Sequence, residues 1–335
     1  MIAPLDVDRD RLSAALQTTR TDLLDAMTSD SHWVGRLSSS PLATATAVSA
    51  LALAEQHIDD GAHVGGATDS TWLSGVMVRN ELNELLIQSL RWIASQQNED
   101  GGWGDTDRSK SNIATTMLVE AAFHLTGVPA KFTGLLERAH TYVESQGGVN
   151  GLRQRYGNDK TFAAPILTNY ALAGMIPWSK TPALPFELAC LPQSWYRRLR
   201  LPVVSYAIPA LAAIGLARHG HAPSINPLLR GVRSLSRKRM LQVVERMQPE
   251  SGGFLEATPL TSFVVMSLAS IGEADHPVVR KGVEFLLASV RGDGSWAIDT
   301  DLSVWNTSQA VLALDWQLTD DAAADQPCSK AMATL

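Results

Sequence analysis

The sequence predicts an all-α fold in which helical hairpins form an α/α toroid. The segment 97–103, QNEDGGW, has the order glutamine, three residues, glycine, one residue, aromatic, and the segment 248–254 repeats this order. Weaker copies end at Trp33, Val149 and Trp296, and apolar runs of helical period lie before and after the loops. A spacing of about 40 to 50 residues with two helices per unit is typical of stacked helical repeats, in which no unit buries its apolar face alone.

Helical periodicity, with little strand-like alternation, marks the elements in order. We predict helices near residues 8–28, 41–56, 73–97, 111–126, 132–146, 162–174, 203–218, 237–248, 259–271, 277–290 and 303–317. Paired into hairpins they give about six units, which a toroid arranges in a ring with one set of helices lining the centre. The segment 175–202, rich in proline and aromatic residues, interrupts the series. We therefore predict one domain over 1–319 and a flexible tail over 320–335.

The repeated loops have a structural explanation. Their glycines permit positive φ at a helix end, and the aromatic residue that follows is a large apolar side chain for the next unit to bury. The glutamine amide can bridge backbone groups that helix ends leave without partners. We interpret these glutamines and tryptophans as braces of the scaffold and not as site residues.

Composition excludes several classes of function. The 335 residues are 45% hydrophobic and 19% charged, with a net charge of −6 and no tract of lysine and arginine, which argues against a nucleic-acid partner. The cysteines, Cys190 and Cys328, lie far apart, and no disulfide or metal framework is evident. The N-terminus has acidic residues where a signal peptide needs basic ones. We expect a cytoplasmic protein.

A membrane surface is a further candidate partner. The longest apolar run, 201–217, is short for a span and contains prolines, so it does not predict a transmembrane helix. Before it, the segment 195–200, WYRRLR, alternates aromatic and basic residues in a way that suits anionic lipid headgroups. The alternatives are peripheral membrane binding and a solvated basic turn.

Two further segments point to a known family. Residues 178–192, WSKTPALPFELACLP, look like its proline-rich segment before a helix, and residues 303–307, SVWNT, resemble its Ser-Pro-Val-Trp-Asp-Thr. Together with the repeats, these segments resemble the N-terminal toroid half of the squalene-hopene cyclase and oxidosqualene cyclase family over about residues 10–315. Protein prenyltransferase β subunits share the toroid. The resemblance implies a terpene cyclase fold, a squalene or other polyprenyl substrate, and class II cyclisation started by a proton.

The sequence lacks the catalytic acid motif of that family. Full cyclases have two toroids, and their catalytic Asp-x-Asp-Asp-Thr lies in the C-terminal one. No such string occurs here, and residues 257–261 read ATPLT, without an acid. The resemblance therefore leaves the proton donor unassigned.

Candidate proton donors are carboxyl groups placed close together, because protonating an alkene requires a strong acid in a dry pocket. We select Asp301 and Asp299, which follow the loop at Trp296, and Glu256, which follows an aromatic loop residue and lies among apolar neighbours. Asp105 and Asp107 form a similar pair beside basic residues. Capping of a helix N-terminus alone would explain each pair.

Aromatic side chains can stabilise a carbocation through their faces. On or near predicted inner helices, the candidate substrate-binding residues are Trp305, Asn306, Phe263, Phe162, Tyr170 and Tyr206. The alternative is that the aromatic residues belong to the core. No Asp-Asp-x-x-Asp and no zinc-ligand spacing occurs, so we predict no metal and no cofactor.

Two hypotheses remain. In the first, the chain is a terpene cyclase, an isomerase or lyase of isoprenoid biosynthesis. In the second, it is a non-catalytic prenyl-lipid-binding subunit, or half of a split cyclase, that requires a partner with the Asp-x-Asp-Asp acid. A second toroid subunit or a homo-oligomer would supply that partner.

Overall fold

The computed structural model describes residues 8–63, 79–128, 132–157, 159–191, 195 and 205–315. These residues are predominantly helical, and the β-structure among them is an isolated bridge between Ala257 and Asp299. The all-α prediction is confirmed. The predicted tail 320–335, Cys328 and the basic residues of 197–200 lie outside the described residues.

The chain divides into two compact units, where the sequence predicts one domain over 1–319. Unit 1 comprises Met1–Leu37 and Asp301–Leu335, and unit 2 comprises Ser38–Thr300. Unit 1 contains α1 (Arg9–Asp25) and α14 (Ser303–Asp315). Unit 2 is thus inserted in sequence between the two helices of unit 1.

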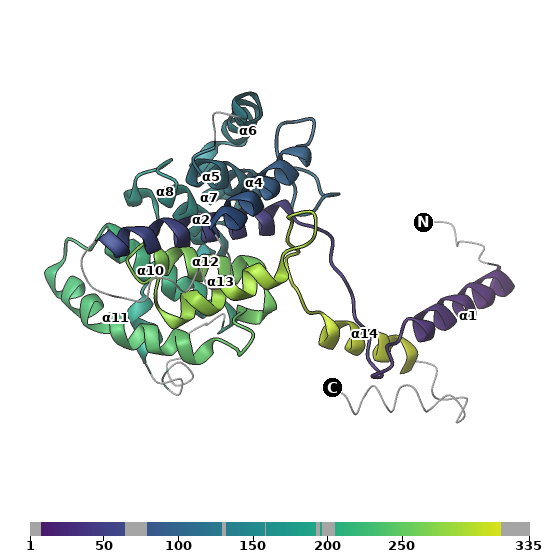
Figure 1. Ribbon diagram of the computed structural model, residues 1–335. Helices are drawn as coiled ribbons and strands as arrows, with labels where there is room; N and C mark the ends of the chain where they lie inside the picture. The colour runs from purple at the N-terminus through teal and green to yellow at the C-terminus, as the bar shows by residue number, and fades with distance from the viewer. Residues whose placement is uncertain are drawn as a thin grey trace, which may run out of the picture. The chain divides into compact units, whose positions relative to one another are not determined.

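Unit 2 contains a closed ring of inner helices, which are labelled in Figure 1. They are α2 (Pro41–His63), α5 (Ile113–Leu125), α8 (Lys160–Leu172), α10 (Ile208–His221) and α12 (Thr258–Ala269). Each packs against the next in this order, and α12 packs against α2 to close the ring. The α/α toroid prediction is confirmed. Within the described part of unit 2 the ring has five inner helices, because the predicted helix over 303–317 belongs to unit 1.

Outer helices cover this ring. They are α4 (Arg79–Ser95), α6 (Thr133–Ser145), α7 (Gly148–Tyr156), α11 (Pro227–Met247) and α13 (Pro277–Ser289), and each packs against at least one inner helix. Short 3-10 turns, η2 (Trp178–Lys180), η3 (Phe186–Cys190), η4 (Ser205–Ala207) and η5 (Phe254–Glu256), connect them. The segment 175–202, predicted to be irregular, contributes η2 and η3, and η3 packs between α10 and α11.

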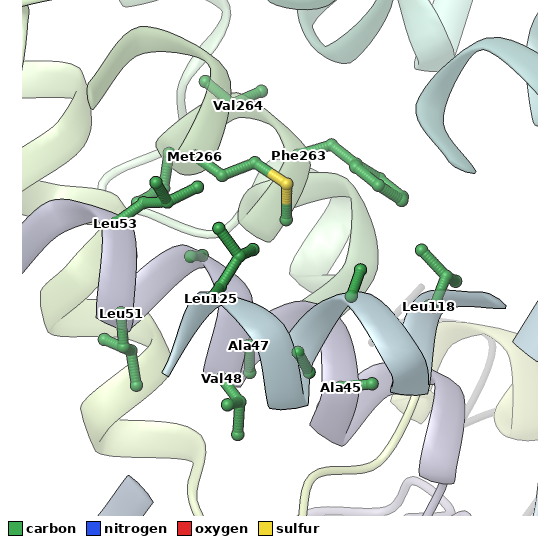
Figure 2. Close-up of a cluster of buried hydrophobic side chains, with 14 of the residues drawn as sticks. Ala45, Ala47, Val48, Leu51, Leu53, Leu118, Leu125, Phe263, Val264 and Met266 are labelled. Atoms are coloured by element: carbon green, nitrogen blue, oxygen red, sulfur yellow. The ribbon is translucent and has the colours of Figure 1, made fainter. Parts of the chain in front are cut away.

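Amino-acid composition separates the two layers. Inner helices contain long runs of apolar or small residues, such as ATATAVSALALA in α2, and a run without a polar face is typical of a buried helix. Figure 2 shows Leu125 of α5 and Met266 of α12 in the cluster that surrounds Ala47 of α2. Small side chains on α2 let both neighbours approach closely.

Two elements differ from the prediction. Helix α11 begins at Pro227, not near residue 237, because Asn226 caps it with hydrogen bonds from the backbone N–H groups of Leu228 and Leu229. Helix α7 replaces a predicted loop. Gly147 adopts a left-handed φ of 88°, which ends α6 and lets a new helix start at once. No helix among the described residues is long and apolar enough to cross a membrane.

Candidate functional site

The first repeat has a specific set of contacts at its aromatic residue. The indole Nε1 of Trp103 donates to the carbonyl of Ile93 in the preceding outer helix at 2.8 Å. Its backbone N–H donates to the hydroxyl of Thr116 on the following inner helix at 3.1 Å. The Gln97 amide donates to the carbonyls of Gly101 and Leu135, at 2.8 and 3.0 Å, and so joins the loop to the next outer helix. One loop therefore connects three helices.

The repeat at Phe254 has the same contacts apart from the indole. The backbone N–H of Phe254 donates to the Thr261 hydroxyl of α12 at 2.9 Å. The Gln248 amide donates to the carbonyl of Gly252 at 2.9 Å and to that of Val278 in α13 at 3.0 Å. The glutamine, the aromatic residue and the threonine thus act together as a structural joint between helices.

In two other repeats, the tryptophan bonds to an inner helix that does not follow it directly in the sequence. In both, the indole Nε1 donates to a carbonyl of the preceding outer helix, at 2.8 Å for Trp296 and 2.6 Å for Trp33. The backbone N–H of Trp296 donates to Thr44 on α2, 252 residues earlier, at 3.0 Å. The backbone N–H of Trp33 donates to Thr307 on α14, 274 residues later, at 3.0 Å. The first contact closes the ring of unit 2, and the second makes α1 and α14 one hairpin.

Asp299 and Asp301 belong to different units. Asp299, at the end of unit 2, is half-buried, and this burial raises the pKa of its carboxyl. Asp301, at the start of α14 in unit 1, accepts hydrogen bonds from the hydroxyl and the backbone N–H of Ser303, at 2.6 and 2.8 Å, which lower its pKa. A raised pKa suits an acid that must stay protonated, whereas Asp301 has the contacts of a helix cap.

Glu256 lies in a strained loop. Glu256 and Leu255 have φ values of 53° and 54°, in a region that residues with side chains rarely adopt. The Glu256 carboxylate accepts a hydrogen bond from the Ser251 hydroxyl, and its backbone carbonyl accepts one from the Thr300 N–H at 2.9 Å. These contacts hold segment 251–257 to residues 299–300, and both segments belong to unit 2.

The predicted substrate-binding residues fall into two groups. Phe162, Tyr206 and Trp305 are more than half exposed to solvent. The Phe162 ring stacks on Tyr156 with centroids 5.7 Å apart. Asn306 packs against Gly35 in unit 1, where an added Cβ would meet its Nδ2 atom at 2.1 Å. The structure therefore does not gather these side chains in one buried cavity.

Phe263 and Tyr170 are buried in unit 2, and Tyr170 leads to a carboxyl that sequence reasoning missed. The Tyr170 hydroxyl donates to Glu120 of α5, and His140 Nδ1 lies 3.7 Å from the other Glu120 oxygen. Glu120 is almost fully buried, and burial raises its pKa, against the opposing effects of Tyr170 and His140. The sequence feature that could have indicated this buried carboxyl is a glutamate within the otherwise apolar run IATTMLVEAAFHL.

The centre of the ring contains polar side chains. The Asn169 amide of α8 donates to the Ser49 hydroxyl of α2 at 3.3 Å, although these helices are not neighbours in the ring. Both side chains are fully buried. Asn169 Oδ1 and Thr168 Oγ1 have no hydrogen-bond partner among the described residues. The side chains of Asn169 and Ser49 therefore bridge the centre of the ring.

The part of the chain that the structure describes contains no cluster of metal-binding side chains. There, no group of three or more histidine, cysteine, aspartate and glutamate side chains could hold an ion.

Comparison with known proteins gives related sequences over part of the chain. Residues 70–207 match the model of the squalene-hopene cyclase N-terminal domain. Enfumafungin synthase of Hormonema carpetanum is 32% identical over 135 residues, which are 40% of this chain and 9% of that protein. The squalene–hopene cyclase of Alicyclobacillus acidocaldarius is 25% identical over 273 residues, covering 67% of this chain and 41% of that protein. The chain thus spans less than half the length of these curated relatives.

Among solved structures, a type II terpene cyclase from Scytonema aligns with 86% of this chain and 81% of its own, at 14% identity and a TM-score of 0.38.

Proposed function

We propose that the chain contributes to class II cyclisation of squalene or another polyprenyl substrate, because residues 70–207 match the squalene-hopene cyclase N-terminal domain and the related sequences include squalene-hopene cyclases. Its role is that of a non-catalytic half. Unit 2 is a helical scaffold, and the proton comes from a second toroid that carries the Asp-x-Asp-Asp acid.

The observation that carries this proposal is the location of the carboxyl groups. Asp301 is held by cap contacts in unit 1, Glu256 fixes a loop, and the centre of the unit 2 ring is bridged by Asn169 and Ser49. A class II acid needs a dry cavity around an alkene, where its proton is made labile. These contacts give Asp301 and Glu256 structural roles, and we assign the proton donor to the second toroid.

A second candidate function is cyclisation by the chain's own acids, and one observation favours it. Burial raises the pKa of Asp299, as a general acid requires. In this alternative Asp299 donates the proton.

Product analysis distinguishes the two functions. The purified chain is incubated with squalene, oxidosqualene and prenyl diphosphates, and cyclic products are sought by mass spectrometry. We expect no product from the chain alone. Turnover by a monodisperse monomer that is lost in an Asp299→Asn/Asp301→Asn double variant, but kept in Asp293→Asn, refutes the non-catalytic role. Asp293 is a suitable control because its carboxylate only accepts hydrogen bonds from Ser295 within its own loop.

Peripheral membrane binding is part of the proposal, since the substrate is a lipid. On α11, Leu228, Val232 and Leu235 form an exposed apolar stripe, which Arg239 and Arg246 continue along the same face. An exposed apolar stripe with arginines is suited to an anionic membrane surface.

We expect co-sedimentation with vesicles containing phosphatidylglycerol, weakened by salt and by a Leu228→Glu/Leu235→Glu variant. Equal sedimentation of the variant and the original chain contradicts binding through α11.

A further inference from the structure

The inner helices of unit 2 contain buried oxygen atoms that have no hydrogen-bond partner among the described residues. These side-chain oxygens belong to Thr168 and Asn169 of α8 and to Thr258 and Ser267 of α12. All of these residues are fully buried. Buried polar groups in proteins are almost always hydrogen-bonded, to protein or to ordered water, and a group left without a partner destabilises the fold. The ring therefore contains polar groups that the protein itself does not satisfy.

Other buried hydroxyls of the inner helices bond within their own helix. Ser262 is an example, because its hydroxyl donates to the Thr258 carbonyl one turn earlier at 2.7 Å. Serine and threonine inside helices usually form this bond, and it needs no further partner. The Thr168 hydroxyl and the Asn169 amide oxygen do not form it. They therefore require a partner from outside α8.

Asn169 lies where α8 faces the centre of the ring. Its Nδ2 atom donates to the Ser49 hydroxyl of α2 at 3.3 Å, and α2 and α8 are not neighbours in the ring. This bond is longer than the usual 2.7–3.2 Å, so the two helices are slightly too far apart for an optimal direct contact. Asn169 Oδ1 remains an acceptor without a donor. Ser49 uses its oxygen to accept, and among the described residues its O–H group has no recorded acceptor.

These two groups define the chemistry of what binds them. Asn169 Oδ1 needs a donor, and the Ser49 O–H group needs an acceptor. Water supplies both from one atom, and proteins use ordered water in this way where a buried site offers two or more polar partners. A hydrocarbon chain supplies neither, and packing it here would leave both groups without hydrogen bonds.

We infer that the centre of the unit 2 ring is a water-binding site, in which an ordered water donates to Asn169 Oδ1, accepts from the Ser49 hydroxyl and joins α8 to α2. The site favours water over an isoprenoid chain, so the polyprenyl substrate does not enter this ring. Water binding does not depend on the proposed function, because the two polar groups need partners whether or not the chain takes part in cyclisation.

Crystallography of the full chain, with and without xenon under pressure, tests the inference directly. Xenon enters apolar cavities that stay dry, whereas a polar site keeps its water. We expect a water within about 2.7–3.2 Å of Asn169 Oδ1 and no xenon there. Xenon at this position overturns the inference. So does a centre without water in which the amide is turned and Oδ1 accepts directly from Ser49.

A measurement in solution uses matched variants. Magnetic relaxation dispersion of the water signal counts water molecules that stay inside the protein. Asn169→Leu, which keeps a similar volume without polar atoms, should lower this count by at least one. Ser262→Ala is the control, since its hydroxyl bonds within its own helix, and it should leave the count unchanged. Equal counts for Asn169→Leu and the original chain contradict the site. If Asn169→Leu does not fold, the xenon experiment on the original chain still decides.

Discussion

Replacing Trp296 by alanine should open the ring of unit 2. The Trp296 side chain is fully buried, its indole N–H donates to Leu286 of α13, and its backbone N–H donates to Thr44 of α2. Burial of about 200 Å² of an aromatic side chain at about 25 cal/mol per Å² stabilises by about 5 kcal/mol. Trp→Ala substitutions in cores cost about 3–5 kcal/mol, and we expect a loss in that range.

The assay is urea denaturation of the full chain, followed by circular dichroism of the helices, which report mainly on unit 2. Trp305→Ala is the matched control. Its side chain is exposed in unit 1, so its removal should change the free energy of unfolding by less than about 0.5 kcal/mol. Equal effects of the two substitutions, or a Trp296→Ala loss below about 1 kcal/mol, would refute the assignment of Trp296 as the closing joint.

Three further perturbations test the packing and the electrostatics. Thr44→Val leaves a buried N–H without its acceptor and should cost about 1–3 kcal/mol of unfolding free energy in urea titrations. Gly253→Ala places a Cβ 2.3 Å from the Phe285 ring and should cost about 1–3 kcal/mol by the same assay, whereas Gly292→Ala, with open space around it, should be nearly neutral. Because burial raises the pKa of Glu120 in the folded state, its stabilising contribution is present below its unfolded pKa and is lost as pH rises through the folded pKa. Unfolding free energies measured above pH 4.5 should therefore fall less with rising pH in Glu120→Gln, and identical slopes would contradict the shift.

The sequence predicted the repeats well because their chemistry is local. The glycines, Trp103 and Gln97 lie within one loop, and the positions of their contacts follow from helix and turn geometry. The start of α11 was missed because its first turns contain more arginine and serine than apolar residues, and the Asn226 cap is a weak signal beside them.

Long-range pairing could not be read from the sequence. Trp33 precedes α2 and Trp296 precedes α14, so sequence order predicts Thr44 and Thr307 as their respective partners. The structure pairs them the other way round, because unit 2 closes on itself before α14 begins. Sequence order likewise does not show that Asp299 belongs to unit 2 and Asp301 to unit 1.

The closure of unit 2 by Trp296 and Thr44 affects how this chain folds during its synthesis. Helix α2 emerges from the ribosome early, and the residue that completes its surroundings follows 252 residues later. At about 5–20 residues per second, α2 waits roughly 13–50 s with its apolar surface incompletely covered. A nascent chain of this kind is exposed to aggregation throughout that interval, and slower translation lengthens it.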